Sequence, residues 1–75
     1  MWKPSKEWLE LYGFEKDPET VYWVQESTEV WYNTRHNEWG VYAFDGRMKQ
    51  FFPVVEQDVL NVIEFFESRK PKTTG

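Results

Sequence analysis

The clearest hydrophobic pattern lies near the carboxyl end of the chain, where apolar residues recur with the spacing of a helix. A helix from about Val55 to Arg69 would gather them into one stripe. The residues of this stripe are Val55, Val59, Val62, Ile63 and Phe66. Acidic residues begin the segment and basic residues end it, which complements the helix dipole. The pattern predicts a C-terminal helix packed on Trp39, Val41 and Met48 of a sheet.

A shorter helix is predicted close to the amino end, between a capping serine and a glycine. Ser5 suits the N-cap position, because its hydroxyl can accept a backbone N–H at the start of a helix. Gly13 stands where a left-handed residue would end the helix. Trp8, Leu9 and Tyr12 share one face. Two turns of helix are marginal alone, so this face is expected to dock on the rest of the protein.

The middle of the chain is rich in branched and aromatic residues, which favour strands. Turn residues divide it into four expected strands, namely Val21–Glu26, Glu29–Arg35, Trp39–Phe44 and Arg47–Phe52. Residues 14–20 are expected to form a connection. A two-residue turn at Ser27-Thr28 would place Glu26 opposite Glu29, and this repulsion favours a looser loop or a bulge.

These elements predict an α+β fold with a short N-terminal helix, an antiparallel meander of about four strands, and a C-terminal helix packed on one sheet face. The alternative is a barrel-like curl of the same strands, which would bury Tyr42 and Phe44. We expect one domain over residues 1–70, followed by a flexible tail at residues 71–75.

Asp45-Gly46 is the strongest hairpin signal in the sequence and predicts a type I′ turn. With these two residues as the loop, Trp39 would pair with Phe52 and Tyr42 with Lys49. Side chains alternate between the faces of a strand. The predicted core face then carries Trp39, Val41, Ala43, Met48 and Phe52. The predicted opposite face carries Tyr42, Phe44, Arg47, Lys49 and Phe51.

This opposite face is the principal candidate site, because it mixes aromatic rings with cations. Such a face can stack bases and hold phosphates of a single-stranded nucleic acid. It can also form a protein interface, or be core because the two helices cover both faces of the sheet. A further alternative is stabilisation alone, with Lys49 against the ring of Tyr42 as a cation–π pair. All of these interpretations fit the pattern.

The tryptophans add one residue to the candidate surface. The four at positions 8, 23, 31 and 39 cannot all be buried on one sheet face, and if Val24 pairs with Trp31, then Trp23 and Trp31 lie on opposite faces. Exposed Trp and Tyr side chains are favoured at interface hot spots. The candidate binding surface therefore comprises Tyr42, Phe44, Arg47, Lys49, Phe51 and Trp31.

Composition narrows the class of partner. The chain has 75 residues, 20% of them aromatic, no cysteine and a formal net charge of −4. Nucleic acids are bound mainly through Lys and Arg. The acidic charge of this chain therefore favours a protein partner, or a partner that is itself basic. No apolar run has the length of a membrane span or the form of a signal peptide. We expect a cytoplasmic protein without a membrane partner.

Catalytic and metal-binding patterns are weak. His36 is the only histidine and stands in an ordinary turn sequence, Arg35-His36-Asn37-Glu38. A metal site needs three or four ligands, and neither EF-hand spacing nor a nucleotide-binding motif occurs. We therefore expect no catalytic, cofactor-binding or metal-ligating residues.

The sequence as a whole favours a non-catalytic protein-binding module. A compact, acidic chain without cysteine would suit a small phage or mobile-element accessory protein that inhibits or adapts a host protein. A homodimer formed through exposed aromatic residues is a second form of protein partner, and single-stranded nucleic-acid binding is the alternative function. The acidic face of the last helix has Asp58 and Glu64, with Glu56 and Glu67 at its flanks. It is expected to be a solvated face, or else to mimic phosphate charge or dock a basic partner.

Overall fold

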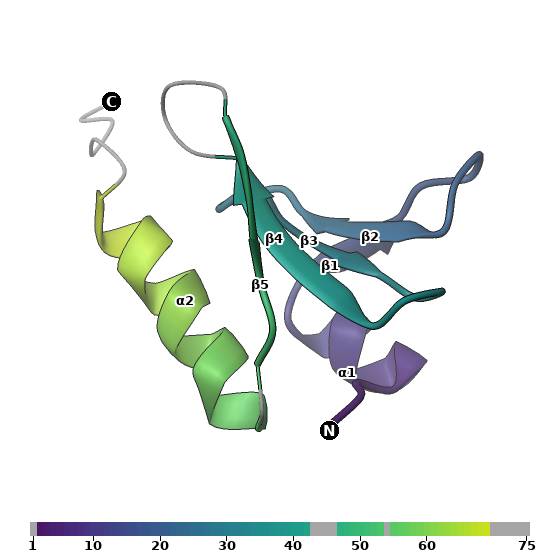
Figure 1. The fold of residues 1–75 in the computed structure, drawn as a ribbon, viewed down its shortest axis with the longest axis horizontal. Helices are drawn as coiled ribbons and strands as arrows, with labels where there is room; N and C mark the ends of the chain where they lie inside the picture. The colour runs from purple at the N-terminus through teal and green to yellow at the C-terminus, as the bar shows by residue number, and fades with distance from the viewer. Residues whose placement is uncertain (1, 43–46, 54, 70–75) are drawn as a thin grey trace.

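The computed structural model describes residues 2–42, 47–53 and 55–69, and it confirms the α+β fold (Figure 1). Its elements in chain order are α1 (Lys6–Leu11), β1 (Phe14–Lys16), β2 (Tyr22–Gln25), β3 (Val30–Asn33), β4 (Glu38–Tyr42), β5 (Met48–Phe51) and α2 (Glu56–Arg69). The strands form a five-stranded sheet in the order β1-β2-β3-β4-β5, and each neighbouring pair is antiparallel.

Helix α1 has the predicted limits. The backbone N–H of Trp8 donates to the hydroxyl of Ser5 over 3.1 Å, which caps the first turn. Gly13 follows the helix with a φ of 84°, a left-handed conformation that glycine adopts without steric cost. Leu9 is buried in the core, so the short helix is held by tertiary packing, as expected.

Strand β1 lies inside the segment that the sequence indicated as a connection. Phe14 pairs with Gln25 of β2 and is almost fully buried, whereas Glu15 and Lys16 are exposed. With one apolar residue in three positions, the strand has too little pattern to be found from sequence. The sheet therefore has five strands rather than about four.

The turn between β2 and β3 is the looser loop that the sequence predicts. The backbone N–H of Glu29 donates to the carbonyl of Gln25 over 2.8 Å, and Glu29 has a φ of 61°. The hydroxyl of Thr28 also contacts the side-chain oxygen of Gln25. Glu26 and Glu29 thus escape the directly opposed pairing that a two-residue turn would impose.

The core lies on one face of the sheet and includes side chains of both helices. Its buried hydrophobic residues are Leu9, Phe14, Trp23, Val30, Tyr32, Trp39, Val41, Val59 and Ile63. Of the predicted stripe on α2, Val59 and Ile63 are buried, while Val62 and Phe66 are partly buried against the core. Val55 precedes the helix and is 51% exposed, so the stripe begins one turn later than predicted.

The pairing of β4 with β5 differs from the prediction by one residue. Trp39 pairs with Phe51 rather than Phe52, and Tyr42 pairs with Met48 rather than Lys49. A shift of one residue turns every side chain of a strand to the other face. The type I′ turn predicted at Asp45-Gly46 lies outside the described residues, as do Ala43 and the tail at residues 71–75.

The shift corrects the predicted core face. Met48 and Phe52 were expected in the core, but they are 56% and 57% exposed. Phe51 is partly buried instead, and its ring stacks on Trp39 with 6.3 Å between the ring centroids. The observed register thus places the ring of Phe51, rather than that of Phe52, against the central tryptophan. The barrel-like alternative would bury Tyr42, which is 45% exposed.

Candidate binding surfaces

The face of the sheet opposite the core, here called the outer face, carries an aromatic cluster. Strand alternation in the observed register places Tyr22, Val24, Trp31, Gly40, Tyr42 and Met48 there. Tyr22, Tyr42 and Met48 are 37%, 45% and 56% exposed. The described parts of α1 and α2 pack with the opposite face, so this cluster stays open to solvent.

Trp31 forms the centre of the outer face. Its ring lies against Gly40 on the neighbouring strand, where a Cβ atom would overlap the ring carbons Cε2 and Cζ2. Tyr22 meets the ring edge-on, with 5.5 Å between centroids and an interplanar angle of 83°. Trp31 is consequently 2% exposed even though it lies outside the core cluster. Its ring is held in place beneath the exposed side chains of Tyr22 and Tyr42, and together they line a cavity of about 200 Å³.

Carboxylates surround this aromatic cluster. A hollow of about 580 Å³ next to Tyr42 and Val24 is lined by Glu15, Lys16, Asp17, Pro18, Glu26 and Glu29. The ammonium of Lys16 donates to the carbonyl of Asp17 over 2.8 Å and to that of Thr20. The hollow therefore has four carboxylates and one amine that is already engaged with backbone oxygens. This hollow beside the outer face is therefore negatively charged at neutral pH.

The structure separates the residues of the predicted aromatic and basic face. Tyr42 and Trp31 lie on the outer face, but Lys49 and Phe51 face the core side with Val41 and Trp39. Lys49 therefore cannot lie against Tyr42 as a cation–π pair. Arg47 precedes β5 and is exposed, and Phe44 lies outside the described residues.

One part of the tryptophan argument is confirmed. Val24 pairs with Trp31, and Trp23 and Trp31 lie on opposite faces. Sequence reasoning missed Tyr22, Val24 and Met48 as members of the same surface. The alternation of β2 could have indicated the first two, because both are out of phase with the buried Trp23 and Gln25.

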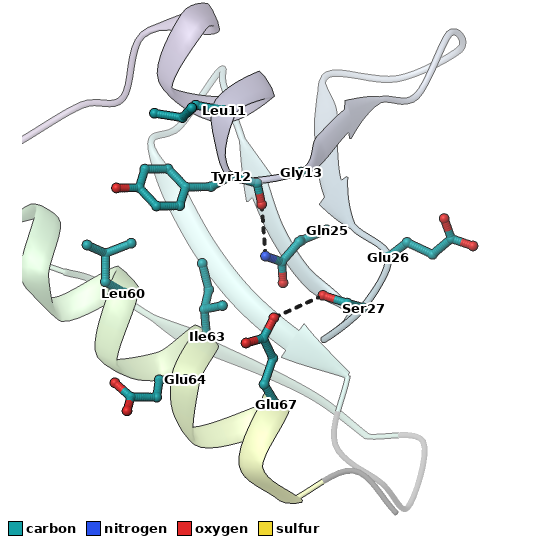
Figure 2. A pocket seen from close by; sticks show the side chains of 10 residues that line it. All are labelled: Leu11, Tyr12, Gly13, Gln25, Glu26, Ser27, Leu60, Ile63, Glu64 and Glu67. Atoms are coloured by element: carbon teal, nitrogen blue, oxygen red, sulfur yellow. Dashed lines mark hydrogen bonds between the residues drawn. The ribbon is translucent and has the colours of Figure 1, made fainter. Parts of the chain in front are cut away.

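A second hollow surface lies between α1 and α2 and is here called the α1–α2 groove (Figure 2). It has a volume of about 760 Å³. Its lining residues are Leu11, Tyr12, Gly13, Gln25, Glu26, Ser27, Leu60, Ile63, Glu64 and Glu67. The side-chain amide of Gln25 donates to the carbonyl of Tyr12 over 2.9 Å and joins the end of α1 to β2. The hydroxyl of Ser27 donates to Glu67 over 3.4 Å, across the groove.

The candidates weighed for chemistry lie as follows in the described structure. His36 is exposed in its turn, and its backbone N–H donates to the side chain of Asn33 over 3.3 Å. No group of His, Asp and Glu within the described ranges could hold a metal ion. Burial raises the pKa of the Tyr32 hydroxyl, which donates to Asn37 over 2.9 Å. This bond ties the core to the turn at Asn37, whose φ is 51°.

Comparisons of the chain with protein-family models, with curated proteins and with solved structures gave no match. Within the ranges that the structure describes, no helix is both long enough and apolar enough to cross a membrane.

Proposed function

We propose that this chain is a non-catalytic protein-binding module that docks a partner protein on its outer face. One observation carries the proposal: Tyr22, Tyr42 and Met48 stand exposed around the fixed ring of Trp31, while both helices pack with the other side of the sheet. Exposed apolar clusters of this kind mark interaction sites, and Tyr and Trp are frequent among the residues that contribute most binding energy.

Preorganisation supports this assignment. Trp31 is held by Gly40 below and Tyr22 at its edge, so its conformational entropy is already lost in the free protein. A partner would then order only the exposed side chains, and each rotamer-rich side chain ordered at an interface costs about 0.5–1.5 kcal/mol. The surface is therefore suited to binding without rearrangement.

Charge favours a protein that is basic around its contact patch. The carboxylates of Glu15, Asp17 and Glu29 border the aromatic cluster, and like charges juxtaposed across an interface are costly. The same carboxylates repel phosphates, and Lys49 lies on the other face of the sheet. A second copy of the chain is also disfavoured, because an isologous contact would place the two acidic borders against each other.

The test is quantitative capture of partners on the immobilised chain, from an extract of the organism that encodes it. Tyr42→Ala should lower capture of the specific partner about 5- to 30-fold, since removal of a hot-spot side chain costs about 1–2 kcal/mol or more. Phe65→Ala is the matched control, because Phe65 is a similarly exposed aromatic residue on α2. A set of captured proteins that Tyr42→Ala leaves unchanged would contradict the proposal.

A further inference from the structure

The α1–α2 groove shares only Glu26 with the hollow beside the outer face, and three separate segments build it. The end of α1 supplies Leu11, Tyr12 and Gly13. Strand β2 and the turn after it supply Gln25, Glu26 and Ser27, and α2 supplies the remaining wall (Figure 2). Natural ligand pockets measure about 300–1,000 Å³, and the volume of about 760 Å³ falls within that range.

The floor of the groove is apolar. Ile63 is 7% exposed and belongs to the core, and Leu60 stands beside it on α2. In Figure 2 the ring of Tyr12 lies across the groove from Leu60. Leu11 is 77% exposed at the end of α1, although it is one of the lining residues. An occupant with an apolar side chain would remove this leucine surface from water, which favours binding.

The rim of the groove is acidic. Glu26 comes from the turn after β2, while Glu64 and Glu67 stand three residues apart on α2, where helical spacing makes them neighbours. The described lining residues include no Lys, Arg or His. The polar contact of Glu67 is with the neutral hydroxyl of Ser27 over 3.4 Å. The charge that complements this rim is therefore positive.

We infer that the α1–α2 groove is a second docking site, and that it binds a basic segment of a partner protein. One apolar side chain of the segment lies on Leu60 and Ile63, and a Lys or Arg on either side of it meets Glu64 and Glu67. A metal ion is a poor occupant, because these carboxylates are not grouped closely enough to hold one in the described structure. A nucleic acid is repelled by the same charges.

The probe for this inference is a nonapeptide of alternating Lys and Leu with capped ends, titrated into the ¹⁵N-labelled full chain. The same peptide with Glu in place of Lys is the charge control. We expect the Lys peptide to bind with a dissociation constant below about 1 mM, and the Glu peptide to give no titration. The amide shifts should gather at residues 11–13, 25–27 and 60–67 rather than at Trp31 and Tyr42.

Matched charge reversals distinguish binding of the peptide at the acidic rim from general attraction of a cationic peptide to an acidic protein. Glu64→Lys and Glu67→Lys should each weaken binding of the Lys peptide about fivefold, and Leu11→Ala should weaken it at least twofold. Glu56→Lys makes the same change of net charge about 12 Å away along α2. That distance exceeds the screening length of about 8 Å at physiological salt, so Glu56→Lys should change the affinity less than twofold.

Three results would overturn the inference: no titration by the Lys peptide, shifts centred on the outer face, or equal weakening by Glu56→Lys and Glu64→Lys. The variant Tyr42→Ala distinguishes a failure of this inference from a failure of the proposed function. That variant should bind the Lys peptide like the parent chain. If it abolishes peptide binding instead, the groove is not the site and the outer face is.

Discussion

Replacement of Gly40 by alanine should be among the most damaging small changes in this protein. A Cβ atom at this position would overlap Cε2 and Cζ2 of Trp31 and would lie 2.6 Å from the carbonyl oxygen of Lys49. The carbonyl belongs to the neighbouring strand and cannot move alone. The Trp31 ring must therefore leave its place on the outer face.

The loss in free energy of unfolding caused by Gly40→Ala can be bounded from the structure. Complete release of the ring would expose about 150–250 Å², and at about 25 cal/mol per Å² this costs roughly 4–6 kcal/mol. Overpacking that is partly relieved by side-chain shifts costs about 1–3 kcal/mol. We expect Gly40→Ala to lower the free energy of unfolding by about 3 kcal/mol. Single domains have about 0.05–0.15 kcal/mol per residue, so a chain of 75 residues would lose a large fraction of its stability.

Urea denaturation followed by tryptophan fluorescence measures this loss, and a double-mutant cycle identifies its cause. In a Trp31→Val background the ring is absent, so Gly40→Ala should cost about 1–2 kcal/mol less than in the parent chain. What remains is the contact with Lys49, offset by the entropy that alanine saves relative to glycine. An equal cost of Gly40→Ala in both backgrounds would show that the ring of Trp31 does not lie against Gly40.

Three further predictions concern the turn after β2, the pH dependence of folding, and nucleic acids. Glu29→Gly should raise the free energy of unfolding by about 1 kcal/mol in a urea titration, because Glu29 has a φ of 61°; a loss of stability would contradict this. Burial raises the pKa of Tyr32, so its stabilising contribution is complete below about pH 10 and is lost as the pH rises through the folded-state pKa. Tyr32→Phe should be less stable at pH 8 and should show a shallower decline above pH 10, and parallel declines would refute the linkage. Short single-stranded DNA or RNA should not bind measurably at physiological salt, and a micromolar titration abolished by Tyr42→Ala would reverse the functional proposal.

Local signals predicted the helices well. The cap at Ser5 and the left-handed Gly13 depend on neighbouring backbone atoms, so the sequence nearby contains the information. The stripe of α2 is a repeating pattern, and its central residues Val59 and Ile63 are buried as expected. Strand β1 has neither a local capping signal nor a repeating hydrophobic pattern. Its pairing depends on one residue, Phe14, and on a partner strand that lies farther along the chain.

The register of β5 shows why the candidate site was only partly predicted. Either Phe51 or Phe52 could supply the ring that meets Trp39, and no local pattern distinguishes them. The choice is made by tertiary packing, in which Phe51 stacks on Trp39 and Phe52 is left 57% exposed. Trp31 and Tyr42 lie on one face of the sheet, although Trp31 is buried there rather than exposed, and their neighbours depended on this choice.

That same register affects the electrostatics of the outer face, on which the proposed class of partner rests. Had Trp39 paired with Phe52, Lys49 would stand next to Tyr42 and the face could attract phosphates. In the observed register Lys49 is paired with Val41 on the core side. The charged strand residues of the outer face are then Glu15 and Glu38, within the described part of the chain. A slip of one residue thus decides whether Lys49 stands on the outer face, so the packing of an aromatic core residue and the charge of the opposite face are physically linked.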